Sequence, residues 1–121
     1  MALGVVLGMP ILLDAHHSFS TVYLQDRKIT IQGRLTQFYF RNPHSFLVLD
    51  ISKHEGEPIH WMAEWDAGGQ LGRLGITRDT LHPGDQLVIQ GNPTRNARDH
   101  RVRMLRVFRP SDGWKWVAPA D

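Results

Sequence analysis

The chain of 121 residues contains no cysteine. Disulfide bonds, thiolate zinc sites and cysteine nucleophiles are therefore excluded, and a metal ion would need histidine, carboxylate, methionine or backbone ligands. Excess charge of one sign is also scarce, since the formal net charge is +2 at pH 7. A domain with so little excess charge binds a polyanion only through a local basic patch.

The sequence has no hydrophobic run long enough to span a bilayer. Met1–Leu13 is nearly all apolar, but its thirteen residues have the length of the hydrophobic region of a secretory signal peptide. Ala15 then supplies a small residue at the cleavage position. We therefore expect residues 1–15 to form a signal-peptide-like segment and residues 16–121 to form one periplasmic or secreted domain. The alternative is a buried N-terminal strand or helix.

The motifs of several common enzyme classes are missing as well. The sequence has no serine in a nucleophile elbow, no His-Glu-x-x-His pattern and no glycine-rich loop of the kind that cradles phosphate. We therefore expect a protein that is not an enzyme.

Apolar and polar residues alternate with a period of two in five segments, which is typical of β-strands with one buried face. These segments are Lys28–Leu35, Ser45–Ile51, Ile59–Trp65, Asp85–Gly91 and Arg101–Arg109. A short helix is expected at Ala67–Leu74 with Asp66 as its N-cap residue, and Trp114–Val117 is expected to add a short closing strand. Three strands, a helical connection and two further strands predict an all-β fold, a small five-stranded OB-like barrel. A small β-sandwich is the alternative.

The inward phase of these strands predicts the hydrophobic core. Its expected members are Ile31, Leu35, Leu47, Leu49, Trp61, Leu87, Ile89 and Val107.

Four short motifs follow one another along the chain. They are Ala15-His16-His17-Ser18-Phe19, Asn42-Pro43-His44, Trp61 with Glu64, and Pro83-Gly84-Asp85. In this order they resemble a family of short exported proteobacterial proteins of unknown function, DUF6152. The resemblance covers roughly residues 15–113 and implies an exported small β-barrel, without implying an activity.

The N-terminal histidines predict a metal site. Cleavage after Ala15 would make His16 the first residue, so that its α-amino group and imidazole could chelate one ion. His17 or His44 could supply a third nitrogen, and such a nitrogen set suits Cu(II) or Zn(II). The alternative is that the paired histidines belong to a solvated N-terminal tail.

Four further residues are candidates for a binding mouth: Tyr39, Asn42, Trp61 and Glu64. Asn42 and His44 would line the mouth, or else Asn42-Pro43-His44 is only a turn. Glu64 could be an acid or a ligand, although cross-strand pairing favours an ion pair with Arg34, Arg103 or Arg106.

The sequence leaves three functions open. The first is a periplasmic binding module that holds copper or zinc through its N-terminal histidines, and the second is a metal-free adaptor for an unknown protein partner. The third is OB-type nucleic-acid binding, in which the arginines of residues 95–109 would meet phosphates while Phe38, Tyr39, Phe40 and Trp61 stack on bases. Export and the low net charge make the third the least favoured.

Overall fold

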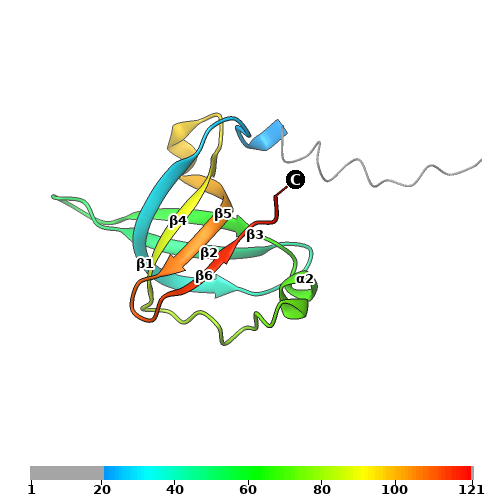
Figure 1. Ribbon diagram of the computed structural model, residues 1–121. Helices are drawn as coiled ribbons and strands as arrows, with labels where there is room; N and C mark the ends of the chain where they lie inside the picture. The colour runs from blue at the N-terminus through cyan, green and yellow to red at the C-terminus, as the bar shows by residue number, and fades with distance from the viewer. Residues whose placement is uncertain (1–20, 121) are drawn as a thin grey trace, which may run out of the picture.

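The computed structural model describes residues 21–120, which form six strands, the short α-helix α2 and a 3-10 turn, and Thr21 and Val22 are helical as well (Figure 1). The elements are β1 Ile29–Tyr39, β2 Ser45–Ile51, β3 Ile59–Trp65, α2 Gly68–Arg73, β4 Gln86–Pro93, η1 Ala97–Asp99, β5 Arg101–Arg109 and β6 Trp114–Val117. Every strand expected from the sequence is present, and β1 runs four residues further than expected, to Tyr39.

The strands close into a barrel of the OB type. They follow the order β3-β2-β1-β4-β5-β6, and an additional parallel pairing of β3 with β5 closes the barrel. β1 belongs to both halves, because Arg34 lies opposite Asp50 of β2 on one side and Gln86 of β4 on the other. The predicted OB-like barrel is therefore confirmed, and the sandwich alternative is wrong.

Two glycines allow neighbouring strands to approach closely. A Cβ atom at Gly33 would lie 2.4 Å from the backbone oxygen of Asp50, and one at Gly91 would lie 2.3 Å from that of Arg103. Since backbone atoms within a sheet cannot move aside cheaply, both positions require glycine. Gly33 lies where β1 leaves β4 for β2.

The core fills the barrel as the alternation predicts. Seven of the eight predicted members are buried: Ile31, Leu35, Leu47, Leu49, Leu87, Ile89 and Val107. The prediction is wrong for Trp61, which is only half-buried. Trp61 lies opposite Leu49 near the start of β3 and packs against the core, but it stays partly exposed, and its ring lies against that of His100 with centroids 5.1 Å apart.

The N-terminus of α2 is capped from another part of the chain. Ala67, and not the predicted Asp66, is the N-cap residue, and its side chain makes no capping bond. The backbone N–H of Gly69 instead donates to Oδ1 of Asn42 at 3.1 Å, and the N–H of Gly68 donates to the carbonyl of Arg41. The loop between β1 and β2 thus satisfies donors that a local cap would otherwise serve.

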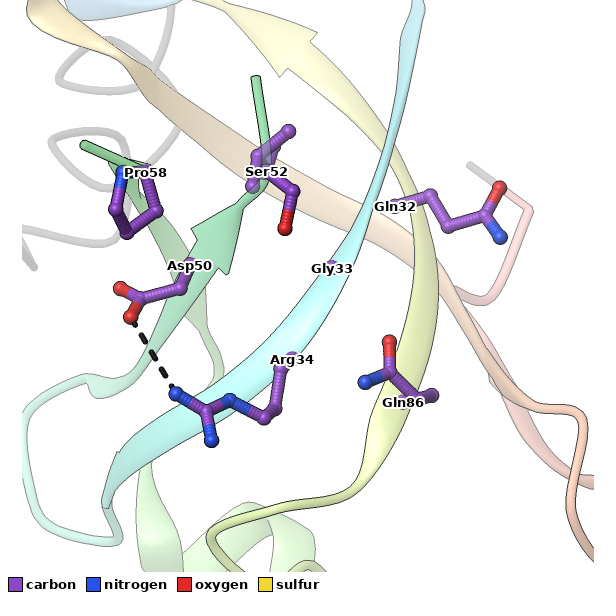
Figure 2. A pocket seen from close by; sticks show the side chains of 8 residues that line it. Gln32, Gly33, Arg34, Asp50, Ser52, Pro58 and Gln86 are labelled. Atoms are coloured by element: carbon purple, nitrogen blue, oxygen red, sulfur yellow. Dashed lines mark ion pairs between the residues drawn. The ribbon is translucent and has the colours of Figure 1, made fainter. Parts of the chain in front are cut away.

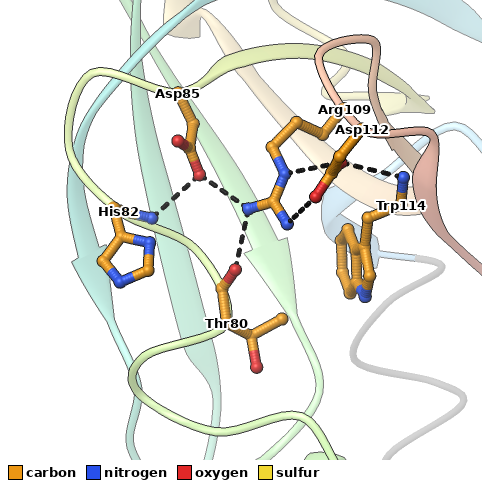
Figure 3. Close-up of polar contacts among 6 residues, drawn as sticks. All are labelled: Thr80, His82, Asp85, Arg109, Asp112 and Trp114. Atoms are coloured by element: carbon orange, nitrogen blue, oxygen red, sulfur yellow. Dashed lines mark hydrogen bonds and ion pairs between the residues drawn. The ribbon is translucent and has the colours of Figure 1, made fainter.

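Arg109 holds the long connection between β3 and β4 against the end of β5 (Figure 3). Its guanidinium donates to the Asp85 carboxylate at 2.9 Å, to the Thr80 carbonyl at 2.8 Å and to both carboxylate oxygens of Asp112. Asp85 also accepts from the backbone N–H of His82, across the turn that contains Gly84 at φ +100°. The Pro-Gly-Asp motif is therefore a turn whose carboxylate anchors Arg109.

Within residues 21–120, no helix is both long enough and apolar enough to cross a membrane.

Candidate functional site

Arginine and aromatic side chains alternate in a row on the outside of the barrel, from the exposed Tyr39 to Tyr23, which is buried. The Arg41 guanidinium lies 5.4 Å from the ring centroid of Tyr39 and 5.3 Å from that of Phe46. The Arg101 guanidinium lies 5.5 Å from the Phe46 centroid and 5.8 Å from that of Tyr23. We call this row of Tyr39, Arg41, Phe46, Arg101 and Tyr23 the ladder face.

Strand register explains why these side chains meet. Tyr39 of β1 lies opposite Phe46 of β2, and Phe46 lies opposite Glu64 of β3. The buried Leu47 is the next residue after Phe46, so Phe46 must point outward, because successive side chains alternate between the two faces of a strand. The parallel closure then places Arg101 of β5 opposite Met62 and diagonal to Glu64.

One end of the ladder face is neutralised. Arg101 donates to Glu64 at 3.1 Å and to the Tyr23 hydroxyl at 2.8 Å. Burial of Tyr23, together with the adjacent Glu64 carboxylate, raises the pKa of its hydroxyl, so Tyr23 is uncharged at any physiological pH. The expected cross-strand ion pair of Glu64 exists, but its partner is Arg101 and not one of the three arginines predicted.

The other end presents an exposed guanidinium. Across residues 21–120, no ion pair joins Arg41 to a carboxylate, and its side chain rests on the two rings alone. Its backbone is fixed, since its N–H donates to the Ser45 hydroxyl and its carbonyl accepts from Gly68. Arg41 is thus a positioned cation whose N–H donors can serve a ligand.

Apolar surface adjoins this cation. Tyr39 is 40% exposed and Met62 is 37% exposed. In the sheet register Tyr39 lies opposite Phe46, and Met62 lies opposite the half-buried Val48, two residues further along β2. Tyrosine, methionine and arginine are the residue types that protein interfaces favour.

The structure separates the other predicted site residues from the ladder face. Tyr39 belongs to it and Glu64 bonds to its member Arg101, whereas Asn42 bonds to α2 and Trp61 packs on His100. His44 is half-buried in the loop between β1 and β2, where it faces the charge of Asp66. His16 and His17 lie outside the described residues. Within the part of the chain that the structure describes, no three histidine or carboxylate side chains could hold a metal ion together.

Sequence reasoning missed Arg41, Phe46 and Tyr23 as members of a site. The alternation alone could have marked Phe46 as an aromatic residue on an outer face. Tyr23 carries no such signal, because it precedes the first strand and reaches the ladder face only through an isolated bridge to Thr94.

An open polar hollow lies on the outside of the barrel beside Gly33, with a volume of about 500 Å³ (Figure 2). Its one carboxylate, Asp50, already faces two cationic partners, Arg34 at 3.8 Å and the imidazole of His60. With its charge already matched, this hollow offers less to a ligand than the ladder face.

No curated protein matches the chain. Residues 5–103 match the sequence profile of a family of unknown function, DUF6152, which covers most of the chain and includes β1 to β4, α2 and the start of β5. The chain therefore belongs to this family of unknown function, DUF6152.

Proposed function

We propose that this protein is a non-catalytic interaction module that binds a partner protein through its ladder face. The observation that carries the proposal is Arg41, an exposed cation whose guanidinium lies over the rings of Tyr39 and Phe46, with Tyr39 and Met62 also exposed. An arginine fixed in this way loses little freedom on binding, and arginine and tyrosine dominate the binding energy of protein interfaces. A carboxylate of the partner protein would form an ion pair with the Arg41 guanidinium and neutralise its charge.

The same contacts disfavour nucleic acid as the ligand. OB domains that bind single strands stack bases on open aromatic rings, but here guanidinium groups already lie over Tyr39 and Phe46. The Glu64 carboxylate at the Arg101 end of the face would also repel phosphates. The net charge of +2 supplies little general attraction to offset that repulsion.

We further propose that the module works in the periplasm or outside the cell. The support is the apolar segment Met1–Leu13 followed by Ala15, the pattern of a signal peptide. Copper or zinc binding by His16, His17 and His44 stays a prediction, and mass spectrometry of the processed chain loaded with Cu(II) would test it.

In-cell photo-cross-linking of the full chain tests the proposed function. A photoreactive residue at Met62 should trap one partner protein, while the same residue at Leu74, exposed at the end of α2, should not trap it. With the partner purified, Arg41→Glu should weaken binding by about thirtyfold, because a central arginine is typically worth about 2 kcal/mol.

Arg78→Glu is the matched control, since Arg78 is also exposed but lies in the connection between α2 and β4. It should change the dissociation constant by less than about twofold. The proposal would be contradicted if the photoreactive residue at Leu74 trapped the partner as efficiently as the one at Met62. It would also be contradicted if Arg41→Glu and Arg78→Glu weakened binding equally. Tight binding of a single-stranded oligonucleotide through Arg41 would favour the nucleic-acid alternative instead.

A further inference from the structure

The last strand of the sheet, β6, has a neighbouring strand on one side only. Its residues Trp114–Val117 pair with Arg106–Arg109 of β5, and it lies beside β5 in Figure 1. The pairing of β3 with β5 that closes the barrel involves Arg101–Arg103, at the start of β5, and does not reach β6. Within residues 21–120, no strand pairs with the far side of β6. We call the backbone on this side, from Trp114 to Val117, the β6 edge.

The backbone groups of the β6 edge belong to Lys115 and Val117. Ala118, the next residue, donates its N–H to the carbonyl of Leu105 at 2.8 Å, so its backbone groups face β5. Since successive residues of an antiparallel strand direct their backbone groups to opposite sides, the N–H and C=O of Lys115 and Val117 face away from β5. Both residues are exposed. The β6 edge therefore presents two donors and two acceptors in the arrangement that an added strand uses.

The outward side chains next to the β6 edge combine positive charge with apolar surface. Lys115 lies opposite Phe108, and Val117 lies opposite Arg106. Phe108 is 37% exposed and Val117 is 49% exposed. Across residues 21–120, no ion pair joins Lys115 or Arg106 to a carboxylate. Two exposed cations thus alternate with two exposed apolar side chains on the outer face of β5 and β6.

This charge pattern discriminates between possible occupants of the β6 edge. A second copy of the chain would add the same two kinds of cation to this face, and a lysine on an edge strand is a common protection against such pairing. A foreign strand with a carboxylate opposite Lys115 would instead form a favourable cross-strand pair of opposite charges. An apolar residue opposite Val117 would cover exposed surface. In an antiparallel strand the apolar residue would come two positions before the acidic one.

We propose that the β6 edge binds an acidic, extended peptide segment of another protein, which adds to the sheet as a further strand beside β6. Backbone hydrogen bonds to Lys115 and Val117 hold the segment, and the carboxylate opposite Lys115 selects it. This surface goes beyond the proposed function, because none of the five residues of the ladder face lies on β6.

Nuclear magnetic resonance of the full ¹⁵N-labelled chain with synthetic peptides tests the proposal. The probe is the end-capped peptide Thr-Val-Thr-Glu-Thr, in which valine and glutamate occupy the expected positions. It should shift the backbone amide signals of Lys115 and Val117 saturably. Thr-Val-Thr-Lys-Thr should bind at least about fivefold more weakly, because like charges would then lie opposite each other. The glutamate peptide with N-methyl groups on valine and glutamate keeps its side chains but lacks two donors, so it should not bind.

Two variants test the backbone and the charge separately. Val117→Pro removes an outward donor and no hydrogen bond to β5, so the barrel should fold while peptide binding is lost. Val117→Ala is the matched control, because it also shortens the side chain but keeps the donor, and it should retain binding. Lys115→Glu should reverse the preference, so that the lysine peptide binds better. Lys53→Glu, at an exposed position between β2 and β3, should leave the preference unchanged.

The peptide comparison on the unaltered chain needs no variant, so a folding defect cannot hide its result. Absence of a saturable shift at Lys115 and Val117 would overturn the proposal, as would equal binding of the methylated peptide or of the glutamate and lysine peptides. Shifts of the same signals with the concentration of the protein alone would overturn it in favour of pairing between two copies. Arg41→Glu should leave peptide binding unchanged, which separates a failure of this inference from a failure of the proposed function.

Discussion

Asp66 is a carboxylate in surroundings that penalise its charge. Burial raises its pKa in the folded chain above the unfolded value, so its contribution to stability is fully present below the unfolded pKa and is lost as pH rises through the folded pKa. We therefore expect Asp66→Asn to raise the melting temperature at neutral pH. The gain should vanish below about pH 4, where an ordinary aspartate becomes protonated.

Thermal denaturation of both proteins across this pH range checks the prediction. A lower melting temperature of Asp66→Asn at neutral pH would mean that the attraction of Arg103 and His44 outweighs the effect of burial.

Gly33 shows how one missing side chain shapes the barrel. In Gly33→Ala the new Cβ would meet the Asp50 carbonyl at 2.4 Å, so β1 and β2 would have to separate. We expect a loss of about 1–3 kcal/mol in the free energy of unfolding, measured by urea denaturation. Gly72→Ala is the control, because no atom lies within 4 Å of its Cβ position and alanine favours a helix by up to about 1 kcal/mol. Equal effects of the two substitutions would contradict the close-approach explanation.

At the scale of elements, Arg109 joins the connection before β4 to the turn between β5 and β6. Arg109→Met should lower the free energy of unfolding by about 1–3 kcal/mol, because Asp85 and the Thr80 carbonyl would lose a charged donor. The exposed Arg106 on the same strand provides the control, and Arg106→Met should change stability by less than about 0.5 kcal/mol. Chemical denaturation checks both substitutions. An unchanged free energy of unfolding in Arg109→Met would show that water can replace the hydrogen bonds of the guanidinium without loss of stability.

The local sequence pattern predicted the strands and most of the core. It could not predict contacts between residues far apart in the sequence, and the site depends on such contacts. Alternation located the strands and seven core residues because the side-chain period of a strand is visible within a few residues. The predicted N-cap residue of α2, Asp66, was wrong because Asn42, far away in the sequence, supplies the hydrogen-bond acceptor for the start of the helix. The predicted ion-pair partners of Glu64 were wrong because the parallel register of β3 with β5 brings Arg101 beside it. That register cannot be read from a local sequence pattern.

At the scale of the whole molecule, closure of the barrel creates the ladder face. Its members come from the segment before β1, from β1 and the loop after it, from β2 and from β5. Arg101 reaches Glu64 and Phe46 only because β3 and β5 pair in parallel. Binding at this face should therefore depend on the intact fold, and no single strand taken from it should retain the activity.

Closure also predicts that the barrel unfolds as one unit. Leu49 of β2 is fully buried, so Leu49→Ala should cost about 2–5 kcal/mol. Since β2 is joined to β5 through β3 on one side and through β1 and β4 on the other, the loss should reach every strand. Hydrogen exchange should therefore show the same fall in amide protection in β2 and in β5, as it does when opening is global. Val48→Ala, at a half-buried outward position, should lower protection much less. Protection that falls in β2 and β3 but persists in β4 and β5 would instead show that the two halves of the barrel open independently.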